Sequence, residues 1–143
     1  MSARRDRPDD VRPTVVPDAS AVLMLLIEPG TRGETAAGRL SGSNLAVPSL
    51  LPYEVANVLR RRRRAGLLSD TEARLAFDAA SSLPVETWPF DAVAERVWAL
   101  GTNLSAYDAS YVALAELLDA VLVTADRRIA AAPGLRCRVD VVA

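Results

Sequence analysis

The sequence predicts an α/β fold in which a parallel sheet of about five strands carries helices on both faces, in the manner of a three-layer sandwich. Short apolar runs alternate with longer helix-like segments along most of the chain. The run 121–123 is apolar at every position, which is typical of a strand buried on both faces. A chain of 143 residues that is 50% hydrophobic can bury such a core as one domain.

Proline and glycine residues mark the ends of the elements predicted in the first half of the chain. Residues 1–12 are polar and mixed in charge, and we expect them to form a disordered tail ahead of a single domain over 13–143. Pro29 and Gly30 stop the first helix, and Gly66 terminates the third. The elements predicted here are a strand over 14–16, a helix over 21–27, a helix over 31–40, a strand over 45–47 and a helix over 51–64.

Two serine-to-acid spacings mark helix starts in the second half. Ser69 with Glu72, and Ser105 with Asp108, each predict a capping box, and Gly101 closes the helix between them. The elements predicted here are a helix over 70–82, a strand over 84–88, a helix over 91–100, a helix over 106–118, a strand over 121–123, a short helix after residue 126 and a final strand over 136–141.

The composition excludes several classes of catalytic site. The chain has no histidine, and all 17 basic residues are arginine. Ser-His and Cys-His nucleophile systems, imidazole metal sites, Schiff-base lysines and the P-loop lysine are therefore excluded. The side chains left for catalysis are carboxylates, and carboxylates without other groups imply a hard divalent metal ion.

Charge, apolar runs and cysteine content indicate the compartment. The net charge of −1 gives no general attraction to nucleic acid or to a membrane. The longest apolar run, 21–27, is far shorter than the roughly 20 residues that a membrane span needs. The single cysteine, Cys137, cannot form an intrachain disulfide and is interpreted as a small strand residue. We expect a cytoplasmic protein.

Four acids are predicted to reach one edge of the sheet. Asp18 and Asp126 directly follow strands, whereas Glu54 and Asp108 lie in the first turns of helices. Taken singly, each is explained as a helix cap or as an acid favoured by a helix dipole. Taken together, with no lysine or histidine to neutralise them, they would repel one another unless a cation bound. Mg²⁺ or Mn²⁺ at such a site can activate water for in-line displacement at phosphorus.

Three polar side chains are placed to support these acids as second-shell groups. Ser20 lies two residues after Asp18, and Thr124 lies two residues before Asp126. Asn57 lies one turn past the acid of the helix over 51–64, on the same helix face. We expect all three to orient the acids by hydrogen bonds.

Four short motifs follow one another in a specific order and spacing. They are Val-Val-Pro-Asp-Ala-Ser at 15–20, Pro-Tyr-Glu-Val-Ala-Asn-Val-Leu at 52–59, Leu-Ser-Ala-Tyr-Asp-Ala-Ser-Tyr-Val-Ala-Leu-Ala-Glu at 104–116 and Val-Thr-Ala-Asp-Arg-Arg at 123–128. With these motifs the chain resembles the PIN-domain ribonucleases, and specifically the VapC toxins of bacterial VapBC toxin–antitoxin pairs, from about residue 15 to its end. Pro17 departs from the pattern, since an aliphatic residue usually precedes the first acid, and the proline could shift that acid slightly.

The resemblance implies a PIN-like fold with strand order 3-2-1-4-5. It implies Asp18, Glu54, Asp108 and Asp126 as catalytic residues and as ligands of Mg²⁺ or Mn²⁺. The implied activity is that of an endoribonuclease toxin, in which metal-activated water hydrolyses RNA phosphodiester bonds and a cognate VapB-type antitoxin neutralises the enzyme. Relatives of this kind commonly form homodimers.

Five consecutive arginines, Arg60–Arg64, end the predicted helix over 51–64. Arg61 and Arg64 fall on the helix stripe of Glu54. Arg61 lies about 10 Å along the helix axis from Glu54, a distance suited to phosphates that flank a scissile one. They are therefore candidate RNA-binding residues, together with Arg127. The alternatives are a solvated helix end favoured by the helix dipole, and a surface that pairs with an acidic segment of an antitoxin.

Two rival functions remain open at this point. The alternative to the nuclease is a catalytically inactive PIN-fold module that binds RNA or a protein. A metal phosphohydrolase with Asp18 as nucleophile is less favoured, because Ser20 stands where such enzymes carry a second acid. No aromatic platform for single-stranded RNA is predicted, since Tyr53, Tyr107 and Tyr111 are interpreted as packing near the helices.

Overall fold

The computed structural model describes residues 11–142 of the chain. The disordered tail predicted for residues 1–12 falls, apart from Val11 and Arg12, outside these described residues and stays a prediction.

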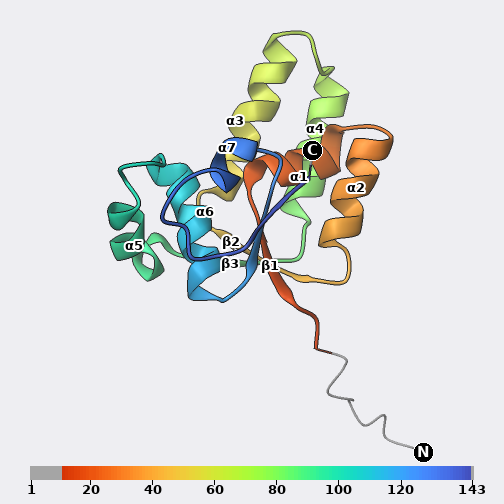
Figure 1. Ribbon diagram of the computed structural model, residues 1–143. Coiled ribbons are helices and arrows are strands. Elements are labelled where there is room, and N and C mark those ends of the chain that lie inside the picture. The colour runs from red at the N-terminus through yellow and green to blue at the C-terminus, as the bar shows by residue number, and fades with distance from the viewer. Residues whose placement is uncertain (1–10, 143) are drawn as a thin grey trace, which may run out of the picture.

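A five-stranded parallel sheet in the order β3-β2-β1-β4-β5 confirms the predicted fold class and strand order (Figure 1). The chain leaves the central strand β1 toward β2 and β3, and then returns to β4 on the other side of β1. Open α/β sheets bind ligands where the strand order reverses in this way, beyond the carboxyl ends of the strands. The strands are β1 Thr14–Pro17, β2 Asn44–Pro48, β3 Val85–Trp88, β4 Val121–Thr124 and β5 Val139–Val141.

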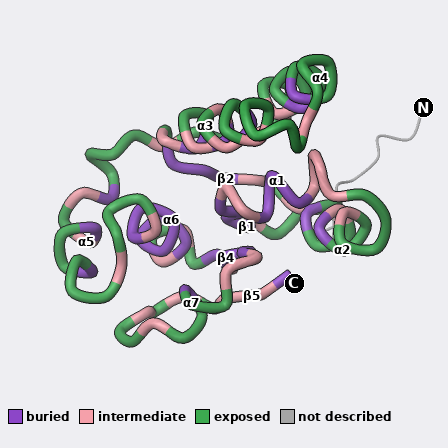
Figure 2. The backbone as a smooth tube through the Cα atoms, turned by 90° about the horizontal axis from the view of Figure 1, so that it is seen from above, coloured by how far each residue is buried: buried purple, intermediate pink, exposed green. Residues whose placement is uncertain are grey.

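Helices cover both faces of this sheet. In Figures 1 and 2, α6 and α5 lie over one face and α1 and α2 over the other, while α3 and α4 form a hairpin that projects past the sheet. Within residues 11–142, no helix combines the length and the hydropathy that a membrane span requires. The helices are α1 Ala19–Ile27, α2 Thr31–Leu40, α3 Leu51–Arg64, α4 Asp70–Ser81, α5 Ala94–Ala99, α6 Ala106–Leu117 and α7 Arg127–Ala130.

The helix predicted over 91–100 is not continuous. A 3₁₀ turn, η2 (Phe90–Ala92), comes first and α5 follows after a break at Val93. The side chain of Val93 is buried in the main core, and its φ of −124° lies outside the helical range. Core packing at this residue thus interrupts the helical pattern that the sequence shows.

The last strand is shorter than predicted, because its first residues bond elsewhere. The backbone N–H of Arg136 donates to Oε1 of Glu116 at 2.7 Å, so pairing with β4 is restricted to the end of the segment. Glu116 also accepts from Nε of Arg96 at 2.6 Å, a contact that ties α5 to α6. One carboxylate therefore holds α5, α6 and the approach to β5 together.

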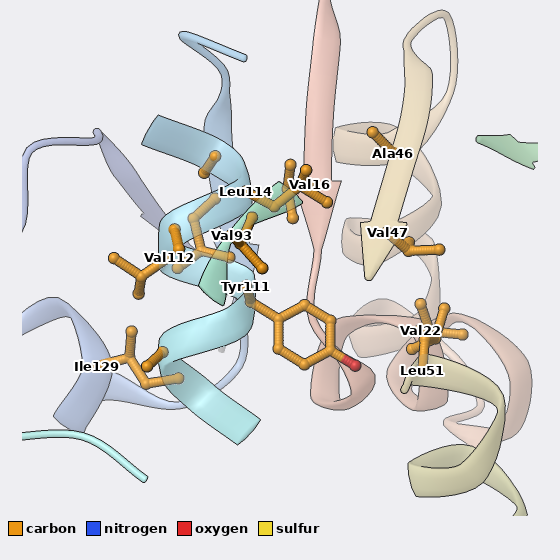
Figure 3. Close-up of a cluster of buried hydrophobic side chains, with 14 of the residues drawn as sticks. Val16, Val22, Ala46, Val47, Leu51, Val93, Tyr111, Val112, Leu114 and Ile129 are labelled. Carbon is orange, nitrogen blue, oxygen red and sulfur yellow. The ribbon is translucent and has the colours of Figure 1, made fainter. Parts of the chain in front are cut away.

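The core lies on both faces of the sheet. Val15 and Val16 are consecutive residues of β1, so their side chains point to opposite faces. Val15 packs in a cluster with α1 and α2, whereas Val16 packs in the larger cluster that includes α6 and α3. Figure 2 shows β1, β2 and the inner sides of α1 and α6 as mainly buried, and Figure 3 shows part of the larger cluster. Burial of both faces explains the continuous apolar runs of the central strands.

Pro17 lacks a backbone N–H, but β1 loses no hydrogen bond to its neighbouring strands for that reason. The paired register of β1 with β2 ends at Val15 opposite Leu45, two residues before the proline. On the other side, the backbone N–H of Asp18 donates to the carbonyl of Val123 at 3.0 Å, so the ladder to β4 continues past Pro17. The proline thus stands where its missing donor is not needed.

Candidate active site

Asp18 follows β1 at the crevice and is only 5% exposed, the most buried acid among the described residues. Its Oδ1 accepts from Ser20 Oγ at 2.5 Å and from the backbone N–H of Ala21 at 3.0 Å. Its Oδ2 accepts from Thr124 Oγ1 at 2.5 Å. Asp18 is therefore the N-cap of α1, as predicted for this acid when it is taken singly. A cap uses one carboxylate oxygen, whereas here both oxygens are held in place.

Thr124 and Ser20 connect the two strands that flank the crevice. Besides its bond to Asp18, Thr124 Oγ1 accepts from the backbone N–H of Asp126 at 3.0 Å. Ser20 Oγ accepts from the backbone N–H of Ala125 at 2.9 Å. The sequence predicts Thr124 as a support for the carboxylate of Asp126. In the structure its hydroxyl serves the carboxylate of Asp18 and reaches Asp126 only through the backbone.

Glu54 lies half-buried in the first turn of α3, where the hydroxyl of Tyr111 on α6 donates to its Oε1 at 2.6 Å. In Figure 3 the ring of Tyr111 lies beside the end of β1, with its hydroxyl pointing toward the start of α3. Burial and the charge of Glu54 raise the pKa of Tyr111 far above its usual range, so the phenol stays protonated as the donor. Sequence reasoning missed this bond. The available signal was the position of Tyr111 one turn past Asp108 on the same helix face.

Asp108 and Asp126 occupy the starts of α6 and α7. Asp108 is half-buried, and its backbone N–H donates to Ser105 Oγ at 3.1 Å, which caps the helix. The carboxylate of Asp126 caps α7 through the backbone N–H of Arg128 at 2.9 Å. The guanidinium of Arg128 also donates to both oxygens of Asp126, at 3.1 and 2.9 Å. Arg128, rather than Arg127, thus pairs with the fourth acid.

The four acids form one electrostatic set. Burial raises the pKa of Asp18, of Glu54 and of Asp108 above their ordinary values. The charges of Asp108 and Asp18 raise the pKa of Glu54 further, and those of Asp18 and Asp126 do the same for Asp108. Asp126 is the exception, because its hydrogen bonds from Arg128 lower its pKa. Three carboxylates that repel one another therefore face a fourth that an arginine neutralises.

This donor set suits a hard divalent cation in its chemistry, since Mg²⁺ and Mn²⁺ prefer carboxylate oxygens. A cation among Asp18, Glu54 and Asp108 would offset the burial of these charges and the repulsion that adds to the raised pKa of Glu54 and of Asp108. With the side chains as they stand, no three Asp, Glu, His or Cys side chains within residues 11–142 converge into a complete ligand set. Glu54 bonds to Tyr111 and Asp126 bonds to Arg128.

A cleft of about 540 Å³ opens beside Glu54. Asn57 and Arg61 line it one and two turns further along α3, and the rings of Tyr53 and Tyr107 also line it. The prediction that the tyrosines pack near the helices is wrong for these two, because they are 75% and 64% exposed. It holds for the third tyrosine, which is buried. Both exposed tyrosines lie in the first turn of their helices.

The predicted arginines separate into two groups. Arg61, the second arginine of the run, lines the cleft. Arg64, at the end of α3, and Arg127, at the start of α7, are exposed and lie outside the lining of the cleft. Of the three arginines predicted to bind RNA, only Arg61 thus lines the cleft beside Glu54.

Comparison with known proteins places this geometry in a family context. The model of the PIN domain family matches residues 15–135. VapC ribonuclease Mb0985 of Mycobacterium bovis is 40% identical over 128 residues, which cover 90% of this chain and 98% of that protein. Ribonuclease VapC1 of Mycobacterium tuberculosis is 41% identical over 128 residues, which cover 89% of this chain and 96% of that protein.

Solved structures show the same fold. The crystal structure of PAE2754 from Pyrobaculum aerophilum is 27% identical, with a TM-score of 0.65 over 91% of this chain and 84% of the other. The crystal structure of VapBC2 from Rickettsia felis, bound to a DNA fragment from its promoter, gives a TM-score of 0.66 over 89% of this chain and 97% of the other. At 12% identity, the second likeness concerns the fold alone.

Proposed function

This chain belongs to the VapC ribonucleases of the PIN-domain family, and we propose that it is an endoribonuclease that hydrolyses RNA phosphodiester bonds with Mg²⁺ or Mn²⁺. We further propose that it acts in the cytoplasm as the toxin of a type II toxin–antitoxin pair, as a homodimer that a cognate VapB-type antitoxin neutralises. The ribonuclease names of relatives that align over nearly their whole length support the activity.

The observation that carries this proposal is the electrostatic coupling of acids at the crevice. Asp18, Glu54 and Asp108 come from three separate parts of the chain. The charges of Asp108 and Asp18 add to burial in raising the pKa of Glu54, and the charge of Asp18 does the same for Asp108. A folded protein gains nothing in stability from such repulsion, so the arrangement favours a cation that binds there.

A bound divalent cation would supply Lewis-acid stabilisation of the negative charge that develops on the phosphate. Asp18 would be its fixed ligand, because hydrogen bonds hold both of its oxygens. Glu54 and Asp108 would complete the site from α3 and α6, and Asp126 would join them once it leaves Arg128. Ser20 and Thr124 would keep Asp18 oriented while it carries the charge.

The rival proposal is an inactive module that binds RNA or a partner protein. Three raised carboxylate pKa values argue against it, since a binding surface for anionic RNA has no use for clustered negative charge. The acids fit a site that handles phosphate only through a cation.

RNA cleavage by the purified, antitoxin-free protein tests the proposal. We expect cleavage with Mn²⁺ or Mg²⁺, loss of cleavage with a chelator, and a fall of at least about 100-fold in Asp18→Asn and in Asp108→Asn. Asp78→Asn serves as the control, because Asp78 is an exposed acid on α4 that pairs with Arg74. Mapping of the RNA ends would then identify the cleavage sites.

Two outcomes would contradict the proposal. Equal cleavage by the wild-type protein and Asp18→Asn would indicate a contaminating nuclease and remove the role of the acids. RNA binding without cleavage, together with no Mn²⁺ binding in calorimetry, would favour the inactive module instead.

A further inference from the structure

The cleft beside Glu54 has two aromatic walls from different helices. Tyr53 lies in the first turn of α3 and Tyr107 in the first turn of α6, and both rings line the cleft. Their exposures of 75% and 64% leave most of each ring open to solvent. Large exposed rings that gather at one cleft are typical of a ligand site rather than of packing.

Each exposed tyrosine directly precedes one of the site's acids in the chain. Tyr53 precedes Glu54, and Tyr107 precedes Asp108. Because Tyr53, Tyr107 and Glu54 line the same cleft, a ligand that fills the cleft against these rings also lies beside Glu54. Tyr111 shows the contrast, since it is buried and its hydroxyl is taken by Glu54.

We propose that Tyr53 and Tyr107 stack on the base of an unpaired nucleotide next to the scissile phosphate, with Arg61 contacting the RNA backbone at the far end of the cleft. The inference rests on the proposed ribonuclease function and deepens it, since it assigns the residues that hold the substrate. Stacking on aromatic rings is open to any base that has been turned out of a helix, whereas bases inside a duplex keep both of their faces covered.

The remaining cleft surface suits a nucleotide. A volume of about 540 Å³ falls within the range of about 300–1,000 Å³ that is usual for small-molecule sites. Asn57 offers an amide that can both donate to and accept from a base edge, and Arg61 offers a guanidinium fork for a phosphate. Leu23 and Val58 add apolar side chains to the lining.

Binding of fluorescent RNA to the full-length Asp18→Asn protein tests the inference without cleavage of the probe. The probes are one short single-stranded RNA, the same sequence as a duplex, and a series in which one base at a time is replaced by an abasic site. The variants, in the same background, are Tyr53→Leu and Tyr107→Leu, which remove the ring, and Tyr53→Phe and Tyr107→Phe, which keep it. Trp98→Leu is the matched control, because Trp98 is 89% exposed on α5 and lies outside the lining of the cleft.

We expect each leucine variant to bind the single strand roughly 5- to 100-fold more weakly, as the loss of one stacked base implies. The phenylalanine variants and Trp98→Leu should stay within about twofold of the parent. One abasic position should weaken binding to the parent protein but not to Tyr53→Leu or Tyr107→Leu. In these variants the ring on which that base stacks is already missing, so removal of the base has no further effect.

The inference is overturned if the leucine variants bind the single strand like the parent, or if the parent prefers the duplex. It is also overturned if the leucine variants bind RNA like the parent but no longer bind a co-expressed antitoxin, since the rings would then contact a protein partner. Failure of the proposed function is distinguishable, because the wild-type protein would then not cleave RNA in the presence of Mn²⁺, whatever the leucine variants do to RNA binding.

Discussion

Tyr111 on α6 donates a hydrogen bond of 2.6 Å to Glu54 on α3, and so joins two helices that are far apart in the sequence. The bond gives the buried phenol a hydrogen-bond partner inside the protein and orients the carboxylate of Glu54 at the crevice. A hydrogen bond to a charged acceptor of this kind contributes about 1.5–3 kcal/mol.

Tyr111→Phe should lower the free energy of unfolding by about 1–3 kcal/mol, because the half-buried Glu54 loses its donor. Urea denaturation at neutral pH without divalent ions measures the effect. Tyr107→Phe is the control and should change stability by less than about 0.5 kcal/mol, since that ring is exposed. Equal stability of Tyr111→Phe and the wild type would show that the bond contributes nothing in solution.

Thr124→Val should lower the free energy of unfolding by about 1–3 kcal/mol. The substitution keeps the shape of a fully buried side chain but leaves Oδ2 of Asp18 and the backbone N–H of Asp126 without their partner. Thermal denaturation followed by circular dichroism would show the loss. Thr35→Val, which removes an exposed bond within α2, should have an effect of less than about 0.5 kcal/mol. A Thr124→Val protein as stable as Thr35→Val would contradict the prediction.

Glu116→Gln should destabilise the protein by about 1–3 kcal/mol at pH 7, and this difference should shrink in acid. Burial opposes the charge of Glu116, but the bonds from Arg96 and from the backbone of Arg136 outweigh it, so its pKa lies below the ordinary value. A carboxyl whose pKa is lower in the folded state stabilises the fold above its unfolded pKa of about 4.3, and this contribution is lost as the pH falls through the folded pKa.

Denaturant titrations of Glu116→Gln and the wild type between neutral pH and about pH 2 measure this dependence. The exposed Glu95→Gln is the control, and its difference from the wild type should be small across the range. A Glu116→Gln effect that stays constant with pH would mean that packing, rather than charge, holds this contact.

Arg128→Ala should strengthen Mn²⁺ binding by a few-fold, because it removes the cation that competes for Asp126. The gain is modest, since Arg128 is largely exposed and exposed ion pairs contribute only about 0.2–1 kcal/mol. Isothermal calorimetry in low salt measures the affinity, with Arg127→Ala as the neighbouring control. Weaker binding by Arg128→Ala than by Arg127→Ala would reverse the role that we assign to Arg128.

Local signals were sufficient to predict most of the fold. The helices over 31–40 and 51–64 match the structure residue for residue, because glycine and proline define their ends through the backbone itself. The capping box of Ser69 and Glu72 is also confirmed. The break at Val93 was not predictable, since it depends on which side chain the distant core accepts.

The positions of the site's acids were predictable from the sequence, whereas their hydrogen-bond partners were not. Strand ends and helix starts placed Asp18 and Asp126 at the crevice, because parallel strands deliver their carboxyl ends to one edge. The hydrogen-bond partners of the acids depend on how α6 packs beside α3 and on which of the two arginines after Asp126 bonds to its carboxylate. The bond of Tyr111 and the pairing of Arg128 therefore required the three-dimensional structure, as did the exposure of Tyr53.

Thr124 has a consequence for how the cleft can adapt. Its hydroxyl and that of Ser20 tie the ends of β1 and β4 together through Asp18, so this half of the site is rigid. Glu54 has a single side-chain donor, and Asp126 has an exposed one. Any adjustment to an incoming ion or RNA therefore falls on the helix starts, while the sheet edge serves as the fixed reference against which they move.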